Sequence, residues 1–185
     1  MEEEPGDWDF APDVTLAHGD VLAGDGWTLE CLHTPGHISN HLCFALASER
    51  GVFTGDHVMG WSSTIIPPPD GTLGDYLRSL ELLIERGDRD QVYWPTHGPA
   101  ITSPVRYARA LLAHRHNRTA QILDCLRHGA ATIPQLVSRI YTDTPKLLHP
   151  AAERSVLAHL IHLTEQDKVT RDPAADERAD EYALA

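Results

Sequence analysis

The 185-residue sequence has no long apolar run and few cysteines, and each absence excludes a class of protein. No apolar stretch approaches the ~20 residues that cross a membrane as a helix. The three cysteines are widely spaced and form no C-x-x-C pair, so they indicate buried free thiols and no disulfide framework. The start, "MEEEPGDWDF", is acidic and has no cationic or apolar run. We therefore expect no secretory signal, a cytoplasmic protein and no membrane partner.

Charge is distributed unevenly along the chain. The net charge is −12 at pH 7, but residues 1–103 carry −13, residues 104–172 carry +4 and residues 173–185 carry −3. A change of this size at one point indicates a domain boundary. We therefore predict an α/β domain over 1–103, a small helical domain over 104–172 and an acidic, disordered tail over 173–185.

The first segment alternates short apolar runs with glycine turns. The strands that we expect lie in "GWTLECLH", "HLCFALA" (41–47), "GVFTGD" (51–56) and "DQVYWP". Before the last strand, "DYLRSLELLIERG" has leucines at helical spacing, with Asp75 as the expected N-cap and Gly87 at the end. Strands followed by a helix and another strand favour an α/β layered domain.

The second segment is predicted to be helical with a strand at its end. Ser103-Pro104 is typical of a helix start, and no proline or glycine follows before Gly129, which predicts one long helix. "TIPQLVSRIY" predicts a shorter helix with Thr132 as its cap, and "AAERSVLAHLIHLTEQDKVTRD" a third helix that runs into a strand. Three helices and a β-ribbon favour a winged-helix-like domain; a plain helical bundle is the alternative.

Three motifs carry a histidine or an aspartate in a loop that follows an apolar run. "HTPGH" ends in His37, "FTGD" ends in Asp56, and "PTHGP" contains His97. Loops at strand ends gather function because the strands hold them rigidly. Zinc binds imidazole nitrogen and carboxylate oxygen, and a catalytic zinc keeps one position for water. Each motif alone is typical of a solvated turn, but the three together favour a metal site.

At these residues the chain resembles the metallo-β-lactamase superfamily, over about residues 14–103. The helical end, with "IYTDTP" and the leucine-rich last helix, resembles the winged-helix appendage of the β-lactamase-like-2 branch. The resemblance implies an α/β fold: the second half of an αββα sandwich followed by a small winged-helix-like domain. It also implies a site for two zinc ions, with His37 on the first metal, Asp56 bridging both as the catalytic carboxylate, and His97 on the second.

The leading motif of that family, H-x-H-x-D-H, would supply four further ligands and is absent from this sequence. "HRHNR" (114–118) contains H-x-H, but it lies in a predicted helix and has Asn117-Arg118 where the motif requires Asp-His. We therefore expect that the chain lacks the first half of the domain, or that a partner completes the site. The sheet face left uncovered favours self-association, for example as a homodimer.

For the complete protein the resemblance implies a zinc-dependent hydrolase, in which the metals lower the pKa of a bound water. The substrate stays open between a small ester or thioester, an amide and RNA. A basic helix face favours a polyanion, whereas a solvated face is the alternative; it comprises Arg106, Arg109, Arg115 and Arg118, with His114 and His116. The chain could instead be a nucleic-acid-binding winged-helix module.

Other candidate residues have simpler interpretations. His57 follows Asp56 and either lines the pocket or packs beside it, and we assign it no metal. His159 and His162 lie among leucines and are expected to be packed or solvated helix residues. The segment "WSSTIIPPP" (61–69) follows the metal loop, so it is either part of the substrate rim or an ordinary surface loop.

Overall fold

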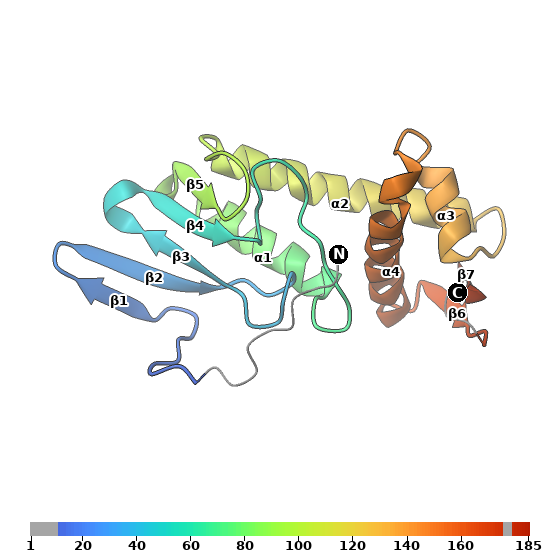
Figure 1. The fold of residues 1–185 in the computed structure, drawn as a ribbon, viewed down its shortest axis with the longest axis horizontal. Coiled ribbons are helices and arrows are strands. Elements are labelled where there is room, and N and C mark those ends of the chain that lie inside the picture. The colour runs from blue at the N-terminus through green and yellow to red at the C-terminus, as the bar shows by residue number, and fades with distance from the viewer. Residues whose placement is uncertain (1–10, 176–178) are drawn as a thin grey trace.

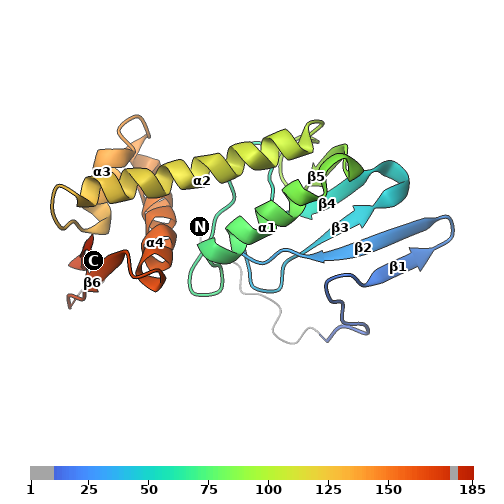
Figure 2. The same cartoon turned by 180° about the vertical axis from the view of Figure 1, so that it is seen from behind.

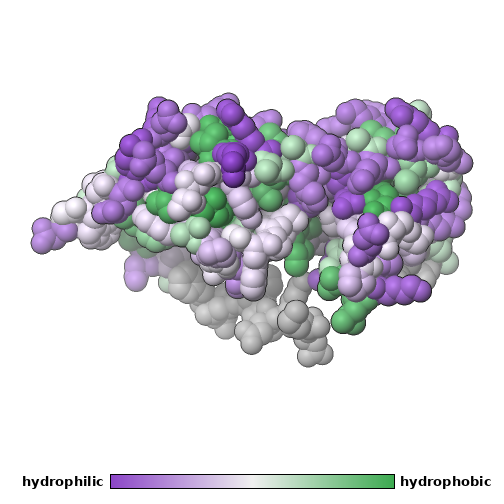
Figure 3. Space-filling view, turned by 90° about the horizontal axis from the view of Figure 1, so that it is seen from above, coloured by the Kyte–Doolittle hydropathy of each residue, from purple (hydrophilic) through white to green (hydrophobic). Residues whose placement is uncertain are grey.

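The computed structural model describes residues 11–175 and 179–185. It has two lobes, a β-sheet lobe and a smaller helical lobe, and the long helix α2 runs along both (Figures 1 and 2). Seen from above, the surface of both lobes is mostly hydrophilic, with small hydrophobic patches between (Figure 3). The elements in chain order are β1 (Val21–Gly24), β2 (Trp27–His33), β3 (Leu42–Leu46), η1 (Ala47–Glu49), β4 (Gly51–Gly55), α1 (Leu73–Glu85), η2 (Gly87–Arg89), β5 (Val92–Pro95), α2 (Pro104–Leu126), α3 (Ile133–Ile140), η3 (Lys146–Leu148), α4 (His149–Glu165), β6 (Val169–Asp172) and β7 (Glu181–Leu184).

The five strands of the first lobe form one mixed sheet in the order β1-β2-β3-β4-β5. The first four strands are antiparallel, whereas β4 and β5 are parallel because α1 crosses between them. The α/β architecture and the four expected strands are therefore confirmed. The edge strand β1 lies outside the strands that we expected, since its four residues are too few to establish an alternating pattern.

One face of the sheet packs against helices. The side chains of Leu32, Cys43 and Val52 on this face are buried against Tyr76 and Leu80 of α1. Both α1 and α2 lie on this same face (Figures 1 and 2). The regular leucine spacing of α1 therefore gives it one apolar side, which covers the sheet.

The opposite face of the sheet is apolar but open. Phe44, Phe53 and Trp94 are register neighbours on this face. The rings of Phe53 and Trp94 lie 4.9 Å apart, and Phe53 is 43% exposed. Trp27 extends the same face and is also exposed. Among the residues that the structure describes, no helix covers this face.

The N-cap of α1 is Thr72, three residues before the expected Asp75. Thr72 has an extended backbone, and its Oγ1 accepts a hydrogen bond from the backbone nitrogen of Asp75 at 3.2 Å. Asp75 lies in the first turn, where a carboxylate is favourable near the positive end of the helix. Both residue types cap helices, so sequence alone did not separate them.

The helix α2 contributes to two hydrophobic cores. Near its start Ala108 packs into the core of the sheet lobe, and near its end Ile122 and Leu126 pack into the core of the second lobe. Ser103 is the N-cap, as expected, but its side chain makes no capping hydrogen bond. Because α2 packs into both cores, the structure does not place the domain boundary at residues 103 to 104, and that boundary stays a prediction.

The second lobe has the elements of a winged helix, which confirms that expectation. Thr132 caps α3 in a capping box with Gln135, and the ribbon of β6 and β7 forms the wing. An isolated bridge joins Ala131 to Tyr182 of β7, so the wing is held at the start of α3.

Part of the tail that we expected to be disordered over 173–185 is ordered, because residues 181–184 form β7; residues 176–178 lie outside the described residues. Residues 181–184 pair with β6, and Tyr182 is buried in the core of the second lobe. An acidic composition was misleading here because one apolar side chain and a backbone ladder are enough to fix four residues. Within the described residues no helix is both long and apolar enough to cross a membrane, and the three cysteines are free thiols.

Candidate metal centre

The three predicted ligands lie together although 60 positions separate the first from the last. His37 follows β2, Asp56 follows β4 and His97 follows β5. The Oδ2 atom of Asp56 is 3.7 Å from Nε2 of His37, and its Oδ1 atom is 3.6 Å from Nε2 of His97. The two carboxylate oxygens therefore point to different histidines, one on each side.

The ring orientation of His37 is fixed by a hydrogen bond from its other nitrogen, Nδ1. Its Nδ1 donates a hydrogen bond to the carbonyl oxygen of Ile65 at 2.7 Å, so the proton is on Nδ1 and the lone pair is on Nε2. Metal-binding histidines are commonly held in this way by an outer carbonyl. The preceding Gly36 has φ of +138°, and a Cβ there would lie 2.4 Å from the Cα of Tyr76 in α1. Only glycine fits between this loop and the helix.

Asp56 leaves the sheet through a tight turn. Gly55 has φ of +52°, and a Cβ there would lie 2.6 Å from Nε2 of His41. The hydroxyl of Thr54 donates to the carbonyl oxygen of Val58 at 2.9 Å and closes the turn. Oδ1 of Asp56 is buried and has no hydrogen-bond partner among the described residues. A buried, unpartnered carboxylate oxygen is costly unless something else binds it.

His97 is held by the loop that follows Asp56. Its ring stacks on that of Trp61, with the centroids 6.1 Å apart and the planes at 7°. Its carbonyl oxygen accepts a hydrogen bond from the backbone nitrogen of Gly60 at 2.8 Å. The "FTGDHVMGW" segment thus supports both its own aspartate and the histidine of a distant motif.

Two further histidines lie next to the site: His57, for which the sequence left lining the pocket and packing beside it open, and His41, for which the sequence suggested no role. His41 is held by Thr34, whose Oγ1 is 2.9 Å from Nδ1, and burial lowers the pKa of His41 to about 4. His57 is fully buried against Tyr76, and burial lowers its pKa to about 3. Neither ring nitrogen of His57 has a partner among the described residues. Both histidines are neutral near pH 7, and the strand and turn positions alone did not reveal their burial.

The carboxylate of Asp56 lies between His37 and His97. Among residues 11–175 and 179–185, no group of three or more His, Cys, Asp or Glu side chains could by itself hold a metal ion. Each oxygen of Asp56 instead faces one histidine, which gives two donors on either side. Zinc takes four ligands, including water in catalytic sites. Asp56 with either histidine thus supplies two donor atoms of the types that zinc binds, fewer than the four ligands that zinc takes.

The basic helix face that we expected is not one exposed surface. Arg115 is buried at 4% exposure, where its guanidinium donates to the carbonyl oxygen of Thr64. Arg118 is half-buried and lies over the ring of Tyr141, with 3.9 Å between Cζ and the ring centroid. Two of the four arginines therefore face inward, because Ser155 of α4 contacts Arg115 and Tyr141 contacts Arg118.

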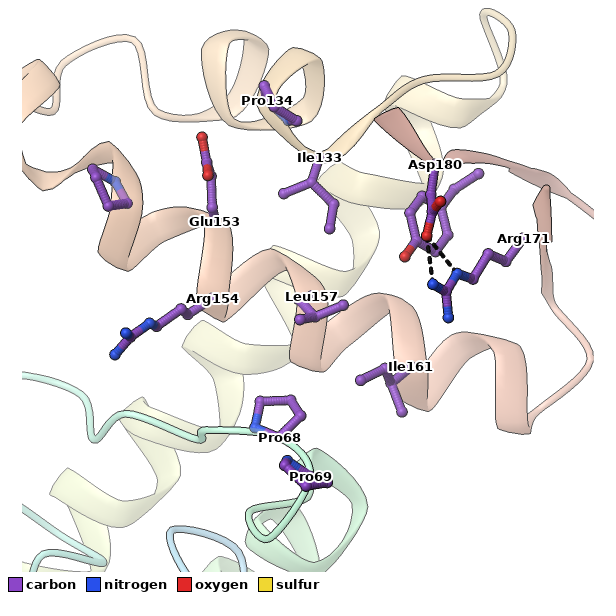
Figure 4. A pocket seen from close by; sticks show the side chains of 12 residues that line it. Pro68, Pro69, Ile133, Pro134, Glu153, Arg154, Leu157, Ile161, Arg171 and Asp180 are labelled. Atoms are coloured by element: carbon purple, nitrogen blue, oxygen red, sulfur yellow. Dashed lines mark hydrogen bonds and ion pairs between the residues drawn. The ribbon is translucent and has the colours of Figure 1, made fainter. Parts of the chain in front are cut away.

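A cavity of about 530 Å³ lies away from these residues, between the second lobe and the proline loop of the first (Figure 4). Pro68 and Pro69 face Leu157 and Ile161 of α4 across it. At its edge Arg171 is ion-paired with Asp180. None of the three predicted ligands lines this cavity, so it is separate from the candidate metal centre.

Comparison with known proteins agrees with the fold of both lobes. The family model "Metallo-beta-lactamase superfamily" matches residues 2–97, and "Beta-lactamase associated winged helix domain" matches residues 132–178. An atrochrysone carboxyl ACP thioesterase from Aspergillus chevalieri is 32% identical over 139 residues, covering 71% of this chain and 43% of that protein. A beta-lactamase-like protein 2 homolog from Drosophila melanogaster is 30% identical over 165 residues, covering 88% and 54%.

A solved structure agrees over nearly the whole chain. A metallo-beta-lactamase family protein from Thermus thermophilus superposes with a TM-score of 0.77 at 27% identity, covering 95% of this chain and 55% of that one. The chain spans about half the length of the curated relatives it matches. With two family models in the expected order and the motif residues assembled at one sheet edge, the chain belongs to the metallo-β-lactamase superfamily and carries its associated winged helix domain.

Proposed function

We propose that this chain contributes His37, Asp56 and His97 to the two-zinc centre of a hydrolase. His37 would hold one ion, His97 the other, and the carboxylate of Asp56 would bridge them. Bound zinc would supply a hydroxide near neutral pH by lowering the pKa of its water, and would polarise the bond under attack. Membership of the family supports hydrolysis as the reaction. That the metal is zinc and that two ions are bound is what we propose.

The position of Asp56 carries the proposal. Its two oxygens lie 3.7 and 3.6 Å from two different imidazole nitrogens, and Oδ1 is buried without a partner among the described residues. An aspartate that served only the turn would use its oxygens on nearby backbone nitrogens. A carboxylate between two oriented histidines is instead a suitable bridging ligand.

Each ion needs donors that the described residues of this chain do not supply. Two protein donors per zinc are too few for a closed or a catalytic site. In this proposal the remaining ligands come from additional polypeptide of the same protein or from a partner chain. The open apolar sheet face around Phe53 and Trp94 supports this, because it is the face on which such polypeptide would pack.

A small ester or thioester is the substrate class that we favour. One relative is described as an ACP thioesterase, and bound zinc would polarise the carbonyl group of a thioester. RNA is the second candidate, supported by the winged helix match. The buried Arg115 and the half-buried Arg118, which lies over Tyr141, weigh against it, because they leave fewer exposed cations on α2 for a phosphate backbone.

Zinc binding tests the ligand assignment directly. We expect weak, saturable binding by the unmodified chain in equilibrium dialysis, and clear loss of that binding in His37→Ala, Asp56→Asn and His97→Ala. His116→Ala, an exposed histidine on α2, is the matched control and should bind as the unmodified chain does. Unchanged zinc binding in the three variants would remove the basis of the proposal.

A further inference from the structure

A second cavity, of about 450 Å³, lies between the loop Ser62–Ile66, α2 and α4. Its wall contains two arginines, Arg115 and Arg118, together with His159 and Tyr141. No aspartate or glutamate is among the described residues that line it. A wall with two guanidinium groups and no carboxylate is unusual in a chain whose net charge is −12.

Arg115 is a buried cation with neutral partners only. Its guanidinium donates to the carbonyl oxygen of Thr64 at 2.5 Å and to the hydroxyl of Ser155 at 3.4 Å, while its Nε has no partner in the described part of the chain. Within the described residues it forms no ion pair. A buried charge without a counter-charge is costly, and burial accordingly lowers the pKa of Arg115.

The other polar groups of the wall are also incompletely paired within residues 11–175 and 179–185. Arg118 lies over Tyr141, donates to the side chain of Gln121, and has an unpartnered Nε. His159 is buried, with Nδ1 2.9 Å from Oγ1 of Thr119 and an unpartnered Nε2. Burial lowers the pKa of His159 to about 3 and also lowers the pKa of His114, the other histidine of the wall, so the positive charge of the wall comes from the two arginines.

The loop that lines this cavity also holds the candidate metal centre. The carbonyl oxygen of Ile65 accepts the hydrogen bond from His37, and the neighbouring Trp61 stacks on His97. Ser62, Ser63 and Ile65 are lining residues of the cavity. The cavity and the metal centre thus share one short loop as a common wall.

We propose that this cavity binds the anionic end of a small molecule, a carboxylate or a phosphate, through Arg115 and Arg118. Guanidinium groups bind both anions with paired hydrogen bonds. The apolar side chains of Ile65, Ile66 and Leu148 in the wall suit an apolar body next to the charge. That this molecule is the substrate of the metal centre rests on the proposed function; the binding of the anion does not.

Calorimetry on the metal-free full chain tests the proposal, with phenyl phosphate, benzoate and phenol as probes. We expect phenyl phosphate or benzoate, or both, to bind, and phenol to bind at least about tenfold more weakly because it lacks the charge. The two anions separate a phosphate from a carboxylate preference. Arg118→Gln should weaken anion binding by about tenfold or more, while Arg109→Gln, an exposed arginine on the same helix, should leave it unchanged.

Two results would overturn the proposal. One is equal binding of phenol and of the anions, and the other is wild-type affinity in Arg118→Gln. Should that variant fold poorly, the Nε–H signals of Arg115 and Arg118 in the unmodified protein decide, since they must shift when phenyl phosphate is added. If Asp56→Asn loses zinc binding but the unmodified chain binds no anion, the proposed metal centre is supported and only the proposal for this cavity is rejected.

Discussion

The Nδ1 of His37 donates a hydrogen bond to the carbonyl oxygen of Ile65 at 2.7 Å, which joins the candidate metal centre to the loop that follows it. This bond fixes the tautomer and turns Nε2 toward Asp56. The same loop lines the cavity that contains Arg115. Any change that moves residues 62–66 should therefore also move the ring of His37, a candidate metal ligand.

Asp56→Asn should strongly reduce catalysis in a preparation that holds two metals. Asparagine keeps the size but loses the negative charge, so the two cations would repel each other more and the second would leave. We expect turnover to fall by on the order of a hundredfold or more, as for loss of a group that stabilises charge. Thioester hydrolysis and zinc content are measured on the same samples.

Asp25→Asn, in the exposed turn between β1 and β2, is the control for Asp56→Asn. It should keep both metals and its rate. If Asp56→Asn does the same, Asp56 is an ordinary turn residue and the bridging role is wrong.

His57 should matter for stability and not for zinc. The side chain is fully buried and its ring lies 4.9 Å from that of Tyr76. His57→Ala leaves a cavity and should lower the free energy of unfolding by about 2–4 kcal/mol, as for other large buried side chains. His57→Leu fills the space and removes two nitrogens that have no partner among the described residues, so it should stay within about 1.5 kcal/mol of the wild type. Urea denaturation measures both; a more stable His57→Ala than His57→Leu would contradict the packing role.

The free energy of unfolding should fall as pH falls below 6.5. The pKa of His159 is about 6.5 when unfolded and about 3 when folded, because the folded protein buries it. Between these values the unfolded state binds more protons than the folded state, so the unfolded fraction grows as pH drops. The contribution of His159 to the free energy of unfolding is fully present above pH 6.5 and is lost toward pH 3. His41 and His57 act in the same direction.

His159→Gln should flatten part of this pH dependence. Urea denaturation at several pH values between about 7 and 4 gives the free energy of unfolding as a function of pH for each protein. Over this range we expect His159 to change that free energy by about a few kcal/mol in total. His116→Gln changes an exposed histidine of α2 and should keep the wild-type slope. A slope in His159→Gln that equals the wild-type slope would show that His159 does not titrate as described.

The open sheet face should make the chain self-associate. Phe53 is 43% exposed and its ring contacts that of Trp94 at a tilt of 39°, and such apolar patches favour contact with other molecules. Phe53→Asp should shift the protein toward monomer in sedimentation velocity without loss of secondary structure. Leu147→Asp, at a residue that is 90% exposed in η3, should not do so. A compact wild-type monomer across the concentration range would reject this expectation.

Several features of the fold could be predicted because local physical chemistry decides them. Thr132 with Gln135 specifies a helix start, since a capping box satisfies backbone donors within four residues. The motifs of His37, Asp56 and His97 could be found because each lies in a turn that must follow a strand end. Local rules separated Thr72 from Asp75 less well, because both side chains suit a first turn.

Other features depended on contacts between distant segments. Arg115 was counted on a basic face, but α4 and the loop at Thr64 bury it. Tyr182 was assigned to a disordered tail, but it enters the core beside Ala131. In both cases the partner lies tens of residues away, so no pattern within one segment reports the contact.

The sequence by itself determined the strand–turn motifs of His37, Asp56 and His97, their order and the helical second lobe, because periodicity, capping and turn chemistry act over a few residues. Only the tertiary structure decided which oxygen of Asp56 faces which histidine, and which cations are buried. The arrangement around Asp56 depends on the loops after β2, β4 and β5 meeting at one sheet edge. That meeting requires the whole core to pack, since hydrophobic burial acts between segments that are distant in the chain.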